Sequence, residues 1–596
     1  MSSVPERSEI PEEYTWDLES IYESDAEWED AYSEAEGHVE ALGAYEDSVT
    51  DDGETLLEVL ELRDTTMRDV SKVAAYARMR SHEDTRDQEY QALSARAGSL
   101  ASEAQSAISY LEPAIQSLDR EDLDAMIEET AGLAEYEHYL DDVIRMKPHT
   151  RSAEVEEVLS ELGEVLGAPN DVYSMLLDAD MTFPTVEKPD GTEVEISQGN
   201  FTVLLKNRDR DFRQTVHESF FEELSSVRNT IGASLKNQVK KDVKSAKIRN
   251  YDSAREAALD GPNIPVEVYD NLVETVDDNL DRLHKHSELK RRALDVDELE
   301  MWDLYMPIAA GDSPEIEYEQ AKEWVVDAMA PLGDDYQQRV ADGLESRWVD
   351  VYENRGKRSG AYSGGTYDTQ PYILMNYQDD ISSMFTLAHE LGHSLHSQLT
   401  SENQPYVYSG YATFVAEVAS TVNEALLTQH LLDVVEDEQL RRHVLNEYLE
   451  RFRSTLYRQT MFADFEQRIH EAEEAGEALT PDKFDEIYGE RKAAYYANAN
   501  VDDHIKREWM RIPHFYYNFY VFQYSTGISA AVALSQDILE EGEPAADRYL
   551  DFLERGSREY PLELLRGAGV DMASPEPVQR ALDVYDDYLD EMDDLI

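Results

Sequence analysis

The sequence contains no cysteine among its 596 residues. Disulfide bonds, thiolate nucleophiles and cysteine-ligated zinc sites are therefore excluded. If the chain binds a transition metal, the ligands have to come from histidine and carboxylate side chains.

Basic residues are scarce. The chain has 53 Lys and Arg residues against 128 Asp and Glu residues, which gives a formal net charge of −75. Such an acidic surface repels nucleic acid and anionic membranes, so we expect neither as a partner. The acidic residues are spread along the whole chain. We interpret this as halophilic adaptation to a salt-rich cytoplasm, because molar salt shortens the Debye length to about 3 Å and screens the repulsion.

Long apolar runs are also missing. No segment approaches the roughly 18 apolar residues of a membrane span, and residues 1–14 have neither the basic nor the apolar region of a signal peptide. The sequence therefore predicts a soluble cytoplasmic protein. Apolar residues make up 41% of the chain, so we expect a globular protein with several domains or one large domain with an added lobe.

Helical periodicity runs through most of the chain and predicts a predominantly α-helical fold. The clearest pattern lies at residues 155–166, where apolar residues recur at i, i+3, i+4, i+7 and i+11. We expect this helix to end near Gly167 and Pro169 and to pack its apolar stripe in a core.

Two stretches predict β-structure. Residues 181–186 and 192–196 flank Asp190-Gly191, a dipeptide typical of hairpin turns. We place a domain boundary here, with a helical N-terminal lobe at 1–200 that ends in the hairpin and a second domain at 201–596. Residues 356–365 are rich in glycine without phosphate-loop spacing, so they predict a tight loop. Residues 372–377 predict a strand, which is either a core strand or an edge that binds a peptide as an added strand.

A His-Glu-x-x-His motif begins at His389. On a helix, His389 and His393 lie on one face, one turn apart, and can both reach a single tetrahedral Zn²⁺. Glu390 borders that face and can act as the catalytic base on a zinc-bound water. The surrounding residues fit a buried helix, with an apolar stripe on the other side (Met384, Leu387, Leu391 and Leu395) and N-cap candidates before it (Asp379, Asp380 and Ser382).

Two histidines leave the zinc one protein ligand short, and without cysteine a carboxylate must supply it. Glu417 lies on a helix expected at about 411–434, between apolar residues, where a carboxylate is costly unless it is paired or bound to metal. We predict Glu417 as the third ligand. Glu424 is the competitor and is better suited to orient a ligand histidine through its free N–H. His396 lies about two turns from His389, too far to bind the same ion, and we interpret it as a residue that either packs in the core or supports a metal ligand.

Residues 512–527 are dense in aromatic side chains with polar tips. Hydrolysis of an amide passes through a tetrahedral oxyanion, which a Tyr hydroxyl or a His N–H beside the metal can stabilise. Each tyrosine by itself is more often a core residue or part of a substrate-binding wall. We predict that His514 and at least one tyrosine of 516–524 face the zinc.

Three segments, 385–396, 414–424 and 513–527, together resemble the M3 family of zinc metallopeptidases, the thimet-oligopeptidase-like group, and within it oligoendopeptidase F. Residues 301–307, 356–362, 371–377 and the hairpin support this. The resemblance covers most of the chain from about residue 150 onward.

The resemblance implies a two-lobed, mostly helical fold with a small β-sheet beside the active site and a deep channel around one zinc ion. It implies cytoplasmic cleavage of internal bonds in short peptides, with 201–596 as the catalytic domain, and we expect a monomer. It assigns the zinc ligands (His389, His393 and Glu417) and the base (Glu390). In mammalian members a His and several Tyr bind the oxyanion and the substrate; the best matches here are His514 and Tyr524, followed by Tyr517 and Tyr520. The tyrosine spacing departs from the thimet type, so the oxyanion-binding Tyr stays open.

Two alternatives to an endopeptidase are a different kind of peptidase and a protein without catalytic activity. A metallocarboxypeptidase of related helical architecture would remove C-terminal residues one at a time. A non-catalytic peptide-binding protein would use zinc for folding alone, but a structural zinc site has no use for a base such as Glu390 beside its ligands.

Overall fold

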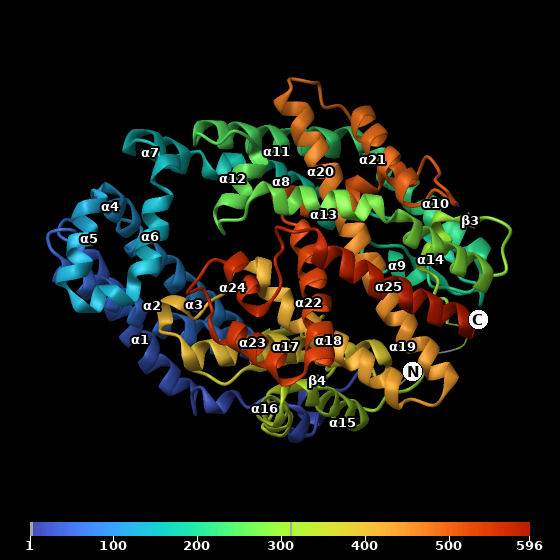
Figure 1. Cartoon of the computed structure of the whole chain (residues 1–596), viewed down its shortest axis with the longest axis horizontal. Coiled ribbons are helices and arrows are strands. Elements are labelled where there is room, and N and C mark those ends of the chain that lie inside the picture. The colour runs from blue at the N-terminus through green and yellow to red at the C-terminus, as the bar shows by residue number, and fades with distance from the viewer. Residues whose placement is uncertain (1–3, 310, 312) are drawn as a thin grey trace. The chain divides into compact units, whose positions relative to one another are not determined.

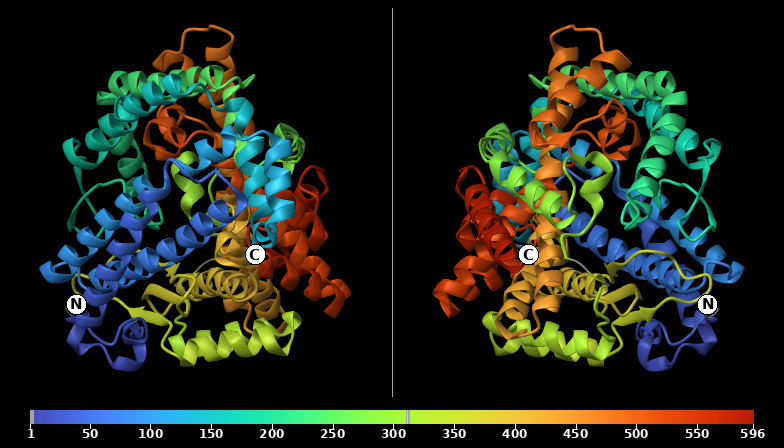
Figure 2. Two further views of the ribbon diagram at one scale, coloured as in Figure 1. Left: turned by 90° about the vertical axis from the view of Figure 1, so that its left-hand side faces the viewer. Right: turned by 90° about the vertical axis from the view of Figure 1, so that its right-hand side faces the viewer.

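The computed structural model describes residues 4–309, 311 and 313–596 and is predominantly α-helical, with three small β-sheets among these residues (Figures 1 and 2). The first three residues of the stretch searched for a signal peptide lie outside the described residues. In the described part of the chain, no helix is both long enough and apolar enough to cross a lipid bilayer.

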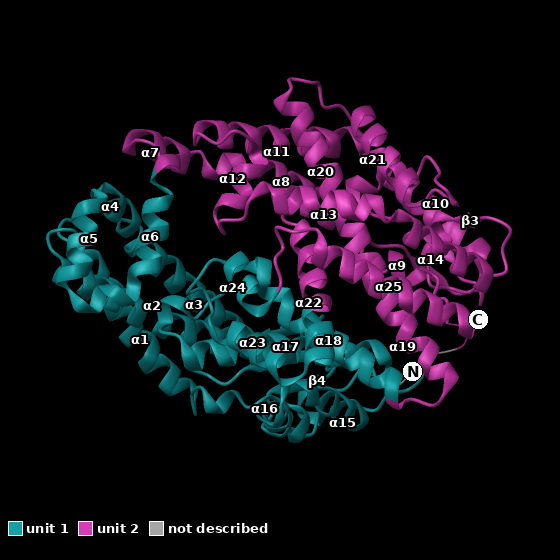
Figure 3. Cartoon of the chain, viewed as in Figure 1, with its two compact units in different colours: residues 1–147, 314–433, 534–569 teal, residues 148–313, 434–533, 570–596 magenta. Residues whose placement is uncertain are grey.

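The chain forms two compact units, each built from three segments (Figure 3). Unit 1 consists of residues 1–147, 314–433 and 534–569, and unit 2 of residues 148–313, 434–533 and 570–596. The two units are defined by how compactly their residues pack, and they do not test which part of the chain is catalytic. The division at residue 200 into an N-terminal lobe and a catalytic domain stays a prediction.

Unit 1 contains long helices from the first segment and a helical layer against a small sheet from the second. Its helices are α1 (Asp25–Leu42), α2 (Gly53–Glu83), α3 (Gln88–Ala107), α4 (Leu111–Ser117), α5 (Arg120–Glu129), α6 (Glu137–Arg145), α15 (Tyr318–Ala328), α16 (Asp334–Glu345), α17 (Ile381–Asn403), α18 (Thr413–Val434, whose last residue lies in unit 2), α23 (Glu543–Glu554) and α24 (Pro561–Ala568). Its strands are β4 (Val349–Tyr352), β5 (Tyr362–Gly364) and β6 (Tyr372–Tyr377).

The sheet of unit 1 has the order β4-β6-β5. β4 pairs with β6 in parallel, and β5 pairs with β6 in antiparallel register, with Ser363 opposite Ile373. β6 is thus the central strand, and five of its six residues are buried. Of the two roles considered for residues 372–377, the core strand is confirmed and the peptide-binding edge is wrong, because both edges of β6 are occupied.

A buried ion pair fixes the glycine-rich loop that precedes β5. Asp350 of β4 is fully buried, and its carboxylate lies 2.6 Å from Nζ of Lys357 and 2.8 Å from a guanidinium nitrogen of Arg7. Burial disfavours the charged carboxylate, but the two cations lower the pKa of Asp350 below its ordinary value. The predicted tight loop therefore contains a buried lysine that holds it to the sheet.

Unit 2 is also helical, with α7 (Ala153–Glu161), α8 (Gly163–Ser174), α9 (Phe201–Leu204), α10 (Arg210–Ser226), α11 (Arg228–Ile248), α12 (Ala254–Asp260), α13 (Val266–Asp278), α14 (Leu280–Ala293), α19 (Glu438–Arg451), α20 (Arg458–Glu474), α21 (Pro481–Tyr495) and α25 (Glu576–Leu595). α22 (Phe522–Glu541) passes from unit 2 to unit 1 after Ala533. The strands are β1 (Thr185–Glu187) and β2 (Glu193–Glu195), which pair with each other, and β3 (Leu299–Glu300) and β7 (Ala499–Asn500), which also pair.

The hairpin expected around Asp190-Gly191 is present. Val186 of β1 lies opposite Val194 of β2, and the Asp190 carboxylate accepts hydrogen bonds from the backbone and the hydroxyl of Thr192 in the turn. Gly191 has a φ of +82°, which a residue with a side chain rarely adopts.

The helix expected to end near Pro169 differs from the prediction in two ways. Residues 153–174 form two helices, α7 and α8, and Pro169 lies inside α8 in place of ending a helix. The apolar stripe is also less buried than a core face, since Val158 is 53% and Val165 67% exposed. Periodicity correctly predicts helix here but does not tell whether the apolar face is covered.

Candidate metal centre

α17 presents the His-Glu-x-x-His motif with its apolar face buried. The Asp380 carboxylate caps the helix by accepting the backbone N–H of Ser383. The predicted stripe is buried completely (Met384, Leu387, Leu391 and Leu395, each 0% exposed). The rings of His389 and His393 lie one turn apart with centroids 4.8 Å from each other, as the motif predicts for a helix.

A glycine lets α18 come close to this motif. A Cβ atom on Gly392 would lie 2.6 Å from the backbone oxygen of Ala419 and 2.6 Å from Cα of Ser420. No larger residue fits there without movement of one helix. The Asn423 side-chain amide adds a second tie by donating to the Ala388 carbonyl at 3.2 Å.

This approach brings Glu417 to the two histidines. Its Oε2 lies 3.4 Å from Nε2 of His389 and 3.7 Å from Nε2 of His393. Neighbouring donors on a tetrahedral Zn²⁺ with bonds of about 2.0–2.1 Å are about 3.3 Å apart. The three side chains are 19–32% exposed, so one side of the cluster is open to water. The arrangement fits a three-ligand metal site with a free position for a water or a substrate.

Each donor is held by a further contact. Nδ1 of His389 lies 2.5 Å from the buried carboxylate of Glu424, the contact expected for the competing glutamate. His393 donates to the backbone carbonyl of Ala416. The Ser420 hydroxyl donates to Oε2 of Glu417 at 3.2 Å. Such contacts orient the ring nitrogens and the carboxylate oxygen that would face a metal.

Glu390 lies beside the cluster and is buried, with 7% of its surface exposed. Burial raises the pKa of its carboxyl group to about 7, and the neighbouring Glu417 acts in the same direction while His389 opposes it. The backbone N–H of Ser363 in β5 hydrogen-bonds this carboxylate, and the Ser363 hydroxyl contacts that of Ser394 at 2.9 Å. The edge strand is thus fixed against α17 next to Glu390.

His396 does not belong to the cluster. It is buried, its ring stacks on that of Tyr411 with centroids 3.7 Å apart, and burial together with the charge on His393 lowers its pKa to about 3. The interpretation of His396 as a packing residue is confirmed.

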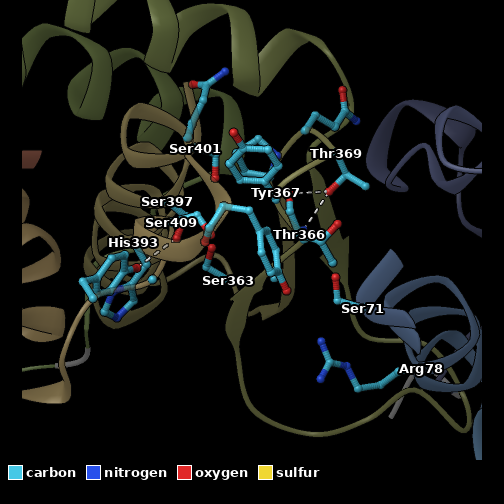
Figure 4. Close-up of a pocket in the computed structure, with 18 residues that line it drawn as sticks. Ser71, Arg78, Ser363, Thr366, Tyr367, Thr369, His393, Ser397, Ser401 and Ser409 are labelled. Atoms are coloured by element: carbon cyan, nitrogen blue, oxygen red, sulfur yellow. Dashed lines mark hydrogen bonds between the residues drawn. The ribbon is translucent and has the colours of Figure 1, made fainter. Parts of the chain in front are cut away.

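A pocket of about 550 Å³ in unit 1 begins at His393, one of the three candidate metal ligands. His393 lines one side and Arg78 of α2 extends into it from the other side, with Ser363 and Tyr367 between them (Figure 4). Most of the remaining wall consists of hydroxyl, amide and glycine residues.

His514 and the predicted tyrosines form a cluster of their own in unit 2. The ring of His514 lies within 5.6–6.2 Å of the rings of Tyr517, Tyr520 and Tyr524 (centroid distances). Tyr517 is half exposed, whereas Tyr516 is buried and stacks on Tyr173.

The backbone of this segment is strained. Asn518 and Phe519 have positive φ angles of 51° and 57°, which is rare for a bulky aromatic residue. The Phe519 N–H donates to the Glu466 carboxylate at 2.7 Å, a contact that holds the turn. Strain of this kind persists when the surroundings fix it and is common at functional sites.

A second group of candidate ligands in unit 2, His217, Asp502 and His504, has its donor atoms within 4.8 Å of one another. Nε2 of His217 lies 3.0 Å from the Asp502 carboxylate, whose other oxygen accepts the N–H of Ile505. Metal-ligating histidines usually donate their second N–H, yet Nδ1 of His217 has no partner among the described residues. We interpret this group as a histidine–carboxylate contact that fixes a loop.

Sequence reasoning missed several residues of the metal cluster. Gly392 sits inside the motif, and its role was not recognised although a glycine in a buried helix signals close packing. Ser420 and Ser363 carried no signal in the sequence, because their partners become neighbours through folding alone.

Known proteins that are similar to this chain are peptidases. Residues 203–584 match the model of a family described as peptidase family M3, and residues 115–183 match one described as oligopeptidase F. The chain is 44% identical to oligopeptidase PepF of Bacillus subtilis, over 100% of this chain and 89% of the relative. It is 38% identical to group B oligopeptidase PepB of Streptococcus agalactiae, over 99% and 98%.

Two solved structures are similar over nearly their whole length. A putative peptidase from Chlamydophila abortus superposes with a TM-score of 0.91 at 32% identity and covers 100% of both chains. Oligoendopeptidase F from Enterococcus faecium superposes with a TM-score of 0.74 at 35% identity and covers 96% of this chain and 99% of that one.

Proposed function

Because this chain belongs to peptidase family M3, we propose that His389, His393 and Glu417 hold one Zn²⁺ and that Glu390 serves as the base that cleaves internal bonds of short peptides. Family membership makes the chain a metalloendopeptidase that acts on oligopeptides. The observation that carries the proposal is the convergence of three donor atoms at near-tetrahedral spacing, open on one side, with Glu390 beside them.

A Zn²⁺ ion bound to these donors would polarise the scissile carbonyl and lower the pKa of a water ligand toward about 7. The chain's own residues then handle the proton. Glu390 removes it as the water oxygen forms a bond to the carbonyl carbon, and returns it to the nitrogen as the C–N bond breaks. Burial beside the donors suits Glu390 to both steps, because it raises the pKa of the carboxyl group above its ordinary value and so favours uptake of the proton.

The contacts around the donors keep this geometry ready. Glu424 orients His389 and the Ala416 carbonyl orients His393, so that both Nε2 atoms point to Glu417. The Ser363 N–H holds Glu390. Rigid placement of this kind matters because small displacements of a base or a ligand lower the rate strongly.

We assign the substrate to the free edge of the sheet. β5 pairs with β6 alone among the described strands, and its Ser363 touches Glu390. A peptide that lies along β5 would bring its backbone past the base. We propose that the oxyanion and the substrate are bound by His514, Tyr524 and Tyr517. Both tyrosine rings lie beside the ring of His514, and the strained residues Asn518 and Phe519 follow Tyr517, which supports this proposal.

The test is a digest of peptides of graded length at molar salt, with and without a chelator, analysed by product mass. We expect cuts at internal bonds, also in peptides with a C-terminal amide, and loss of cleavage with chelator. Removal of single C-terminal residues from free acids alone would instead indicate a carboxypeptidase.

Glu390→Gln should lower kcat by about 10²–10⁴-fold while zinc stays bound, because it removes the base and no ligand. Glu402→Gln, on the exposed end of the same helix and paired with Arg339, is the matched control and should cleave normally. Full activity of Glu390→Gln would refute the assignment of the base.

A further inference from the structure

The pocket next to the metal cluster differs from the rest of this protein in its charge. Of the 596 residues in the chain, 128 are Asp or Glu. None of the residues that line the pocket is acidic; the wall is made of hydroxyl, amide, aromatic and glycine residues together with His393 and Arg78 (Ser71, Ser363, Gly364, Gly365, Thr366, Tyr367, Thr369, Gln370, Pro371, Ser397, Gln398, Ser401, Tyr406, Ser409, Gly410 and Tyr411). An acid-free wall in such a chain favours an anionic ligand.

Arg78 is the charged group of this pocket, and none of the residues that the structure describes pairs with it. α2 carries three other arginines, and each of them pairs with a carboxylate (Arg63 with Asp64, Arg68 with Asp368, and Arg80 with Glu19 and Glu83). Arg78 makes no ion pair and no side-chain hydrogen bond with any of the described residues, and its side chain is exposed to the pocket (Figure 4). In a chain with more than twice as many acids as bases, an unpaired guanidinium is an exception.

The neighbours of Arg78 do not neutralise it. His82 lies one turn further along α2, and burial, followed by the charges of Arg358 and Arg78, lowers its pKa to about 4. A guanidinium nitrogen of Arg358 donates to Nε2 of His82 at 3.0 Å, so that Nδ1 carries the proton and donates to the Tyr362 hydroxyl. At physiological pH His82 is therefore neutral and Arg358 is positive, so neither gives Arg78 a counter-charge.

We propose that this pocket binds a carboxylate of the peptide substrate through Arg78, and so selects peptides with a free C-terminus or an acidic side chain on that side of the scissile bond. The inference rests on the proposed function, since His393 at the other side of the pocket marks the reacting end. A guanidinium binds a carboxylate in a bidentate manner, and the surrounding hydroxyl groups can donate to the same oxygens.

The experiment compares one peptide sequence in three forms: with a free C-terminus, with a C-terminal amide, and as the amide with one Asp placed in turn at each position after the cleaved bond. Arg78→Gln should reduce the preference for the carboxylate form over the plain amide, measured as the ratio of kcat/KM, by about 5- to 10-fold, as expected for a solvent-accessible charged hydrogen bond. The change should appear in KM and not in kcat. Arg78→Lys should restore part of the preference, because lysine keeps the positive charge but cannot bind a carboxylate through two parallel N–H bonds.

Arg96→Gln is the control, since it removes the same charge from the exposed face of α3, where Arg96 pairs with Glu29. It should leave the preference unchanged. Raising the salt from 0.15 M to 1 M, which shortens the Debye length from about 8 to 3 Å, should weaken the preference of the wild type and leave that of Arg78→Gln nearly constant.

The results separate the two sources of the carboxylate. A loss confined to free-acid peptides identifies the C-terminus, and a loss confined to Asp-containing amides identifies a side chain. Equal kcat/KM for all forms in the wild type, or equal effects of Arg78→Gln on the acid and the amide, would overturn the inference.

Failure of the proposed function gives a different pattern. If the wild type cleaves no peptide at all, the pocket can still be tested by fluorescence anisotropy with labelled free-acid and amide peptides. Tighter binding of the acid that is lost in Arg78→Gln would then support the pocket while the peptidase proposal falls.

Discussion

Replacing Gly392 by alanine tests whether the contact between α17 and α18 fixes the metal donors. The added Cβ would lie 2.6 Å from the Ala419 oxygen and from Cα of Ser420, whereas ordinary van der Waals contact begins at 3.4 Å. If no other atom moves, the two helices must therefore separate by 3.4 − 2.6 = 0.8 Å. Metal–ligand bonds tolerate about 0.2 Å of error, so even half of this displacement exceeds the tolerance.

The expected effect falls on metal binding more than on folding. Overpacking costs about 1–3 kcal/mol, and alanine recovers about 0.5–1 kcal/mol of helix propensity, so the metal-free protein should lose at most about 2.5 kcal/mol. Glu417 moves with α18 while both histidines stay on α17. We therefore expect zinc affinity to fall by about 10- to 100-fold, which is the range typical of mutations in residues that orient metal ligands.

The assay is a titration of the metal-free protein with Zn²⁺ against a competing chromophoric chelator, together with urea unfolding of the same samples. Gly98→Ala is the matched control, because Gly98 also lies in a helix of unit 1 and has nothing within 4 Å of its Cβ position. It should gain about 0.5–1 kcal/mol and bind zinc normally. Wild-type zinc affinity in Gly392→Ala would refute the idea that this contact sets the donor spacing.

Three further predictions follow from the described contacts. Glu424→Gln should weaken zinc binding about 10- to 100-fold by releasing His389, whereas Glu417→Ala should abolish it; the reverse order, measured by the same titration, would show that the wrong glutamate was chosen as ligand. Asp350→Ala should destabilise the protein by about 3–5 kcal/mol in urea unfolding, because it leaves the buried charge of Lys357 without its carboxylate. The pKa of Asp350 is lowered in the folded protein, so its stabilising contribution is present above about pH 4 and is lost as the pH falls through the folded value. The difference in the free energy of unfolding between the wild type and Asp350→Ala should therefore become smaller in acid. Finally, the melting temperature should rise steeply with KCl toward molar concentrations, because screening relieves the repulsion within a chain of net charge −75, and a flat salt dependence would count against the halophilic interpretation.

Much of the candidate site could be predicted because its signals are local. The spacing of His389 and His393 on one helix follows from the period of the helix. The residue types predicted a cap at Asp379, Asp380 or Ser382, and the structure selects Asp380. The prediction for Glu417 needed one further argument, the cost of placing a carboxylate inside an apolar helix. The contact of Glu424 with His389 is the one expected for the competing glutamate.

Other predictions failed or stayed open where the outcome depended on distant segments. β6 reads as a strand, but its place between β4 and β5 comes from pairing with two strands that both precede it in the chain. The stripe of α7 and α8 reads as a core face and is exposed at Val165, because periodicity says nothing about the partner. The place of His514 and its tyrosines at the zinc remains a proposal.

The sequence by itself determined the helical class, the candidate donor types and the motif that presents His389, Glu390 and His393 on α17, because each depends on near neighbours in the chain. The tertiary structure alone decided which oxygen of Glu417 meets the histidines and how closely α18 approaches at Gly392. It also decided that Arg78 lies at an acid-free pocket with no ion-pair partner in the described part of the chain. These features arise from contacts between residues separated by tens to hundreds of positions, and no local pattern encodes whether such a contact forms or is left free for a substrate.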